Sequence, residues 1–371
     1  MRTDELGERL FTSVLGMLDV LSIHVGDQLG LYRLLHDAGP LDEAEVARRA
    51  GLHPRYAREW LEQQVVAGLL AVDEPTAAPQ HRRYSLPGEH APVLCDAEDL
   101  AFLAPFARMM AAAAGQLPAL LTAYRDGGGV PWERFGPWMR TGQAAQNRPL
   151  FLQVLGREWL PSLPEVHRRL LDGGRVADIG CGEGWSAIGT AIAYPAAQVD
   201  GFDVDAASLQ AARHQAAASG LQDRVRFHHV DGAAAAGVAG QMAGEAGEAG
   251  GQPGQGRYDL VTLFECVHDL PDPVAVLAGA RRLLAPGGVV LVMDERVPDR
   301  FTGAGDPVEQ LMYGFSLFVC LPDSLSHPGS VGTGTVMRPE VLRGYAEAAG
   351  LGRFEVLPVE HEIFRLYLLR E

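Results

Sequence analysis

The sequence of 371 residues contains no lysine, so arginine supplies every basic side chain apart from histidine. A lysine-derived Schiff base is therefore excluded as a catalytic device. Basic residues are also in the minority, because 31 arginines stand against 47 aspartates and glutamates and the formal net charge is −16. Such a charge opposes sequence-independent attraction to a phosphate backbone. On these grounds we expect no nucleic-acid partner.

Cysteine is scarce and scattered. The four cysteines (Cys95, Cys181, Cys266 and Cys320) form no C-x-x-C pair and have no histidine at zinc-ligand spacing, so we expect free thiols, no disulfide framework and no metal site. The first ten residues are charged and are followed by no signal-type apolar stretch, and we find no run of about 20 apolar residues such as a membrane span needs. We therefore expect a cytoplasmic protein with no membrane partner.

The N-terminal third is helical by pattern, and the length of the chain favours two domains or more. Apolar residues from Phe11 to Val25 recur at helical spacing and make one face, which needs a partner and predicts a homodimer. Helix signals then run from Asp42 to Gly51 and from Pro54 to Gly68. Two short β-prone pieces follow at 69–72 and 82–86, and together they predict a winged helix in a domain of residues 1–95.

Residues 96–171 are predicted to form helices that link the two domains and cover the substrate. The Gly-rich segment "RDGGGVPWERFGPW" interrupts them. From residue 172 onward, strand-like runs alternate with helical ones, which predicts an α/β, doubly wound, Rossmann-like domain over residues 172–371. The strand-like runs are "RVADIG", "QVDGFD", "VRFHHV", "YDLVTLF", "GVVLVMD", "RFEVL" and "IFRLYLL". Within this domain, the Gly/Ala-rich stretch 232–256 predicts a flexible surface insertion.

A glycine-rich turn, "RVADIGCGEGWSAIGTA", follows the first of these strands. Counted from Gly182 it fits G-x-G-x-x-A, a dinucleotide fingerprint, so a nicotinamide-dependent oxidoreductase stays open on spacing alone. Counted from Asp178 it reads D-x-G-x-G-x-G, and a second carboxylate, Asp203, closes the next strand. In that geometry the backbone N–H groups of 180–184 can approach an anionic ligand group such as a carboxylate, and Asp203 can accept hydrogen bonds from two hydroxyls.

These motifs, together with "VRFHHVDG", "YDLVTLFECVHDLPDP" and "ARRLLAPGGVVLVMDE", resemble the class I S-adenosylmethionine-dependent methyltransferases. The whole chain resembles the bacterial small-molecule type with an N-terminal winged helix, which also shows "MDERV" and "GTGTVMRPEVLR"-like segments. The resemblance implies a seven-stranded, mostly parallel sheet and S-adenosylmethionine as cofactor. It implies cofactor-binding roles for Asp178, Gly180, Gly182, Gly184, Asp203, Val204, Asp231, Gly232 and Phe264.

A candidate base lies just after the fourth strand-like run, in "ECVHDLPD". His268 stands at the carboxyl edge of the predicted sheet, where ligands bind, and the resemblance gives it the role of general base with Asp269 beside it. Glu295 and His361 rank lower, as residues that could orient the base or the substrate. His228 and His229 alternate along one strand, so a metal shared between them is not expected.

Aromatic residues gather in the cover segment and after the fifth strand-like run, and aromatic faces suit flat acceptors. The candidates for substrate contact are Tyr124, Trp132, Trp138, Met139 and Tyr313. We therefore predict an S-adenosylmethionine-dependent O-methyltransferase acting on a small aromatic molecule of secondary metabolism. The alternatives are a C- or N-methyltransferase on a heteroaromatic acceptor such as an indole, and a winged-helix DNA-binding regulator.

Overall fold

The computed structural model of the chain describes residues 1–245 and 258–371, and the chain runs through two compact units. The first unit comprises 1–112 and 137–149, and the second comprises 113–136 and 150–371. The helical segment 96–171 is therefore shared between the units. Helix α8 (Trp132–Leu150) contains the boundary, because Gly136 there has a φ of +75° and is followed by Pro137, a pair that interrupts regular helix.

The first unit is a winged helix preceded by one long helix. Its elements are α1 (Thr3–Gln28), α2 (Leu31–Ala38), α3 (Glu43–Ala50), α4 (Pro54–Val66), β1 (Ala71–Val72), η1 (Pro79–His81), β2 (Tyr84–Ser85), η2 (Gly88–His90), α5 (Ala91–Leu94) and most of α6 (Ala104–Gly115). Local signals place α3, because the Asp42 side chain accepts a hydrogen bond from the Glu45 N–H (2.8 Å) and Gly51 ends the helix with φ +67°. β1 and β2 pair antiparallel, so the predicted winged helix is confirmed.

The core of this unit holds one polar network. The Tyr32 hydroxyl donates to Oε1 of the fully buried Gln64 (2.5 Å), whose amide nitrogen donates in turn to Ser22 (2.9 Å). Arg108 adds a two-pronged ion pair to Asp27, at 2.6 and 2.8 Å. Satisfied groups of this kind join α1 to α4 and α6 without leaving a buried charge unpaired.

Helix α1 is long and largely apolar. Within the described part of the chain it is the helix that could cross a membrane by length and composition, although Asp19 interrupts its apolar residues. Core helices and signal sequences meet the same test. Its apolar residues are exposed along most of its length, among them Phe11, Val14 and Leu18.

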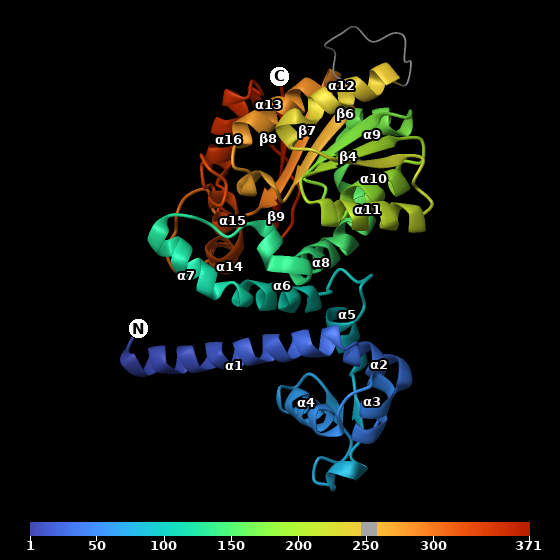
Figure 1. The fold of residues 1–371 in the computed structure, drawn as a ribbon, viewed down its shortest axis with the longest axis vertical. Coiled ribbons are helices and arrows are strands. Elements are labelled where there is room, and N and C mark those ends of the chain that lie inside the picture. Colours follow the sequence, from blue (N-terminus) through green and yellow to red (C-terminus); the bar gives the residue numbers. More distant parts are fainter. Residues whose placement is uncertain (246–257) are drawn as a thin grey trace. The chain divides into compact units, whose positions relative to one another are not determined.

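The second unit is a seven-stranded sheet, among the described residues, covered by helices on both faces (Figure 1). The strands are β3 (Arg175–Ile179), β4 (Gln198–Asp203), β5 (Val225–His229), β6 (Tyr258–Phe264), β7 (Leu284–Glu295), β8 (Arg353–Val356) and β9 (Phe364–Arg370). Their order is β5-β4-β3-β6-β7-β9-β8, and every pair is parallel except β7–β9 and β8–β9. The predicted α/β, doubly wound, Rossmann-like fold is confirmed.

Helices and short turns of this unit connect the strands or precede them. They are α7 (Leu117–Asp126), η3 (Phe151–Trp159), α9 (Pro164–Leu171), α10 (Trp185–Ala193), α11 (Ala206–Ala218), η4 (Gly232–Ala234), α12 (Ala235–Glu245), η5 (Val267–Asp269), α13 (Pro273–Leu283), α14 (Pro307–Phe315), η6 (Ser316–Cys320), α15 (Leu321–Leu325) and α16 (Pro339–Ala348). From β3 the chain proceeds outward through β4 and β5, then returns to β6 on the other side of β3. Open sheets of this type bind ligands at the carboxyl ends of the strands, where the strand order reverses.

The Gly/Ala-rich stretch is in part a structural element, contrary to the predicted flexible insertion. Residues 232–245 form η4 and α12, while 246–257 lie outside the described residues. Ala235 and Ala239 are buried in the core beneath α13. Small side chains permit this close packing, because a Cβ at Gly279 of α13 would lie 2.7 Å from the Gly232 carbonyl oxygen. A deletion of this stretch that includes Ala235 and Ala239 would therefore remove core contacts.

Candidate active site

The glycine turn after β3 is held tightly by its own backbone. The Gly180 N–H donates to the Phe202 carbonyl (2.8 Å), the Gly182 N–H donates to Asp203 Oδ2 (2.8 Å), and the Gly184 N–H donates to the Cys181 carbonyl (2.8 Å). These three N–H groups are therefore engaged within the protein, and their approach to a ligand's carboxylate stays a prediction. The turn can still present the N-terminus of α10, which begins at Trp185.

Glycine is required in the turn for two different reasons. Gly180, Gly182 and Gly184 all have positive φ, at 71°, 51° and 83°, a region that side chains disfavour. A Cβ at Gly180 would lie 2.8 Å from Cys266 Sγ, and one at Gly184 would lie 2.6 Å from the Phe227 ring. At Gly182 a Cβ would meet nothing within 4 Å. The middle glycine therefore leaves open space beside the turn.

Asp178 is the buried anchor of this turn. Its carboxylate accepts hydrogen bonds from the hydroxyls of Ser186 (2.5 Å) and Thr262 (2.6 Å), which joins β3 to α10 and β6. Burial raises the pKa of Asp178 to about 6, against the opposing effect of those two hydroxyls. Both oxygens are thus engaged within the protein, so the structure gives Asp178 a role in shaping the turn. Its predicted contact with a cofactor stays a prediction.

Asp203, at the end of β4, faces the same turn. Besides Gly182, it accepts a hydrogen bond from the Asp205 N–H, at 2.8 Å. Burial raises the pKa of Asp203, against the lowering effect of these backbone donors. Val204, the next residue, is exposed. The carboxylate therefore lies next to the glycine turn at the carboxyl edge of the sheet, the position predicted for a group that binds two hydroxyls.

The other predicted cofactor residues follow β5 and end β6. Asp231 is exposed and caps η4 through the Ala233 N–H (2.7 Å). A Cβ at Gly232 would lie 2.7 Å from the Ile179 side chain, so this glycine allows close packing against β3. Phe264 is buried and stacks on Phe151, with ring centroids 5.6 Å apart. Their roles in cofactor binding stay predictions.

His268 is buried in η5, directly after β6. The turn that leads to it is strained, because Glu265 has a φ of 49°, a conformation that costs energy and is common at functional sites. The His268 side chain lies between two strand ends, with Nδ1 2.9 Å from Asp294 Oδ1 and 3.1 Å from Glu295 Oε2 at the end of β7. A carboxylate at Nδ1 keeps a proton on that nitrogen, so the neutral imidazole carries its lone pair on Nε2.

The charges around His268 set its protonation. Burial lowers its pKa, but the carboxylates of Asp269, Asp294 and Glu295 outweigh that effect, and the pKa lies well above the ordinary value. Burial also raises the pKa of Glu295, to about 8. The buried cluster formed by His268 and these carboxylates therefore holds a proton at neutral pH.

Two members of this cluster were not predicted. Asp294 is fully buried, and its place in "MDER" beside the predicted Glu295 was a usable signal, since both close β7. Cys320 is the last residue of η6 and lies far along the chain from His268. In the fold, its Sγ lies within 4.8 Å of a nitrogen of His268 and a carboxylate oxygen of Asp269. Only tertiary folding joins those residues.

Of the predicted substrate-contact residues, three belong to the second unit. The Trp132 N–H donates to Asp323 Oδ1 (2.7 Å), which holds it against α15. The Tyr124 hydroxyl reaches the Leu317 carbonyl (3.4 Å), and Arg338 reaches the Tyr313 hydroxyl (3.4 Å).

Trp138 and Met139 belong to the first unit. There the Trp138 ring meets His24 edge-on at 4.5 Å, and Met139 is fully buried. The five predicted substrate contacts are therefore divided between the units, and their contact with substrate stays a prediction.

The lower-ranked histidines are occupied in structural contacts. His228 Nε2 pairs with Asp200 (3.0 Å), while His229 Nε2 reaches the Val204 carbonyl (2.8 Å), so the two point to different partners as the alternation predicts. His361 Nδ1 accepts hydrogen bonds from the N–H groups of Ile363 and Phe364 at the start of β9. Burial lowers the pKa of His361.

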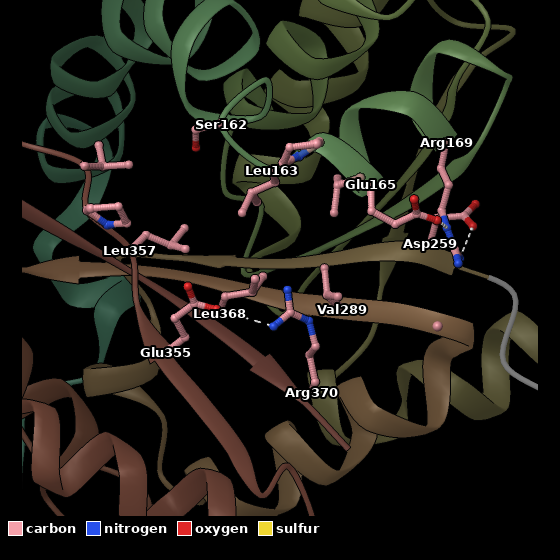
Figure 2. Close-up of a pocket in the computed structure, with 15 residues that line it drawn as sticks. Ser162, Leu163, Glu165, Arg169, Asp259, Val289, Glu355, Leu357, Leu368 and Arg370 are labelled. Atoms are coloured by element: carbon pink, nitrogen blue, oxygen red, sulfur yellow. Dashed lines mark hydrogen bonds and ion pairs between the residues drawn. The ribbon is translucent and has the colours of Figure 1, made fainter.

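A cavity of about 350 Å³ lies between α9 and one face of the sheet and reaches the amino edge at Asp259 and Gly287 (Figure 2). Apolar side chains such as Leu163 and Leu368 line it together with charged groups. Figure 2 shows those charges in ion pairs, Arg169 with Asp259 (3.1 Å) and Arg370 with Glu355 (3.4 Å). No residue of this cavity was among the predicted site residues.

Comparison with known proteins assigns both domains. Residues 177–290 match the family model of a methyltransferase domain, and residues 18–96 match that of an Rv2258c-like winged HTH domain. The ubiquinone biosynthesis O-methyltransferase of Psychrobacter arcticus is 34% identical over 122 residues, which are 33% of this chain and 41% of that protein. The chain thus spans about two fifths of that relative's length.

Solved structures match the whole chain in fold. Human N-acetylserotonin methyltransferase, solved in complex with S-adenosylmethionine, has a TM-score of 0.69 at 20% identity, covering 100% of this chain and 99% of that one. The mitomycin 7-O-methyltransferase MmcR has a TM-score of 0.64 at 20% identity, covering 99% and 98%. The predicted class I methyltransferase domain behind a winged helix is therefore confirmed.

Proposed function

We propose that this chain, a class I methyltransferase with an N-terminal winged helix, transfers a methyl group from S-adenosylmethionine to a hydroxyl of a small aromatic molecule. The residues at the carboxyl edge fit that cofactor: Asp203 offers a carboxylate for ribose hydroxyls, and Gly182 leaves open space beside it. When bound, the cofactor supplies a methyl group already activated on a sulfonium. The work left to the protein is positioning and removal of one proton.

His268 removes that proton. Asp294 holds Nδ1, so the lone pair on Nε2 of the neutral imidazole would accept the proton of the acceptor hydroxyl. The carboxylates of Asp294 and Glu295 stabilise the imidazolium that results. The observation that carries the proposal is the 2.9 Å contact between His268 and Asp294 at the carboxyl edge, beside the glycine turn.

The hydroxyl acceptor is proposed from the names of similar proteins. The relative from Psychrobacter arcticus is named an O-methyltransferase of ubiquinone biosynthesis, and MmcR is named a mitomycin 7-O-methyltransferase. A carbon or nitrogen acceptor would need less help from a base. The test is transfer of labelled methyl from S-adenosylmethionine to a panel of phenols, naphthols and hydroxyindoles. Transfer to oxygen supports the proposal, whereas products methylated only on carbon or nitrogen contradict it.

A DNA-binding role is disfavoured by charge pairing in the winged helix. Arg55 pairs with Glu59 and Arg58 with Glu43, while Arg82 pairs with Glu62 at 2.7 Å. Arginines already matched by carboxylates gain little from phosphates. We therefore propose that nucleic acid is not a partner, and a gel shift at moderate salt tests this directly.

We further propose that the protein is a cytoplasmic homodimer. The support is the exposed apolar surface of α1, where residues as large as Phe11 and Leu10 are about two thirds exposed. Many exposed apolar residues along one helix are typical of an interface with another chain. Light scattering at low protein concentration is expected to report two chains, and a monomer would contradict the proposal.

A further inference from the structure

Three donor atoms of different chemistry meet on the Nε2 side of His268. A nitrogen of His268, a carboxylate oxygen of Asp269 and the Sγ of Cys320 lie within 4.8 Å of one another. η5 supplies two of these residues, and the end of η6 supplies the third. Imidazole, carboxylate and thiol together are ligands typical of zinc and related thiophilic cations.

The spacing suits a tetrahedral ion. His268 Nε2 lies 3.4 Å from Asp269 Oδ1, a long ion-pair contact. Two ligands at zinc distances in a tetrahedron are separated by roughly 3.4 Å, and a sulfur ligand lies slightly farther away. The nitrogen and oxygen therefore already stand at the separation that one shared cation requires.

Unsatisfied polar atoms point to a missing ligand at this place. Asp269 Oδ1 and Thr335 Oγ1 are buried and accept or donate no N–H or O–H hydrogen bond within the described residues, and their polar neighbours are His268 Nε2 for Asp269 and the Cys320 thiol for Thr335. Thr335, which is 2% exposed, interacts with the Cys320 thiol. Buried polar atoms without partners are rare in proteins, and a cation would satisfy the carboxylate directly.

Charge and access also suit a divalent cation. A thiolate at Cys320, the Asp269 carboxylate and a neutral His268 carry two negative charges, which a divalent ion neutralises. A buried group of ligands costs less free energy when the bound ion cancels its net charge. The Asp269 side chain is 30% exposed, so it offers the ion a route from solvent.

We propose that His268, Asp269 and Cys320 form a binding site for a thiophilic divalent cation of the zinc class, and that the bound cation silences methyl transfer by occupying the base nitrogen. The inhibitory half rests on the proposed function. The binding half stands by itself, because it needs only the three ligands.

Cobalt(II) is the probe, because a cobalt–thiolate bond gives a near-ultraviolet charge-transfer band. Titration of the full chain is expected to produce this band at one ion per chain, and Cys320→Ser is expected to abolish it. The matched control is Cys266→Ser, because this second thiol lies beside Gly180 and contacts the Ile179 carbonyl, outside the three-ligand group. A band that survives Cys320→Ser, or that Cys266→Ser abolishes, overturns the proposal.

Asp269→Asn keeps the cysteine and provides a second variant should Cys320→Ser fail to fold. It is expected to weaken cobalt binding about tenfold or more while keeping the charge-transfer band at saturation. Unchanged affinity overturns the assignment of this ligand.

In the labelled-methyl assay, zinc is expected to inhibit the wild type, with recovery on chelation. If the cobalt band behaves as expected but zinc does not inhibit an active enzyme, the inhibitory half is wrong. If no phenol is methylated, the proposed function has failed while the cobalt result stands unaffected.

Discussion

The two edges of one sheet differ in how their charges are matched. At the amino edge, a cavity of about 350 Å³ is lined by charged side chains. They are partly exposed, and each has a partner of opposite charge, such as Glu355 for Arg370. At the carboxyl edge, one histidine, His268, is buried among the three carboxylates of Asp269, Asp294 and Glu295. Imbalance of this kind is costly and is retained at functional sites. The difference teaches that unbalanced buried charge, more than hollow space, locates the chemistry.

The largest effect that we expect falls on His268. His268→Ala should slow methyl transfer by about 10²-fold to 10⁴-fold, because a general base contributes that much to the transition state. Affinity for S-adenosylmethionine should stay nearly unchanged, because the base acts on the acceptor's proton. The measurement is steady-state transfer of labelled methyl to a phenol. Activity retained within a few-fold would show that the buried cluster is not the base.

The pH dependence sharpens the same point. Neutral imidazole is the base, and the surrounding carboxylates hold the pKa of His268 well above 6.5. The ratio kcat/KM should therefore rise with pH and level off only above that raised pKa. Asp294→Asn removes one of the carboxylates and should move the midpoint to lower pH. A wild-type midpoint at or below 6.5 would contradict the coupling.

The next prediction concerns side-chain packing in the glycine turn, which lies at the same edge of the sheet as the buried charges. Gly184→Ala forces a side chain into φ +83° and against Phe227, and it should lower the free energy of unfolding by about 2–5 kcal/mol. Gly182→Ala is the matched control, because it shares positive φ but has open space. Urea denaturation should show the smaller loss for Gly182→Ala, and equal losses would rule out the packing argument.

At the amino edge we expect almost no effect. Glu355→Gln breaks the pair with Arg370, in which both side chains are about half exposed, and such pairs contribute about 0–1 kcal/mol. Thermal unfolding and methyl transfer should both stay close to those of the wild type. A large loss of activity would move the functional site to the cavity and reverse the comparison.

Much of this arrangement could be predicted from the sequence, because its signals are local. Asp42 and Gly51 delimit a helix through caps that lie within one turn, and the glycine turn follows its strand directly. The same locality places His268 after β6. Parallel pairing of β3 with β4 then brings Asp203 to the glycine turn, as expected from strand order.

The remainder depends on contacts that no local pattern encodes. The N–H groups of Gly180 and Gly182 donate hydrogen bonds to Phe202 and Asp203 in the neighbouring strand. The sequence of the turn alone could not show that these donors are already engaged. Alanines such as Ala239 pack beneath α13 although their composition is that of a loop. Cys320 reaches the site only through folding of η6.

The most direct test of the account is calorimetric titration of the wild type with S-adenosylmethionine and, separately, with NAD. We expect micromolar binding of the first and none of the second. Asp203→Ala should weaken binding about 10-fold to 100-fold, because charged hydrogen bonds contribute about 1.5–3 kcal/mol. Glu355→Gln should leave it unchanged. Binding of NAD in preference, or affinity that Glu355→Gln reduces while Asp203→Ala does not, would contradict a methyltransferase site at the carboxyl edge.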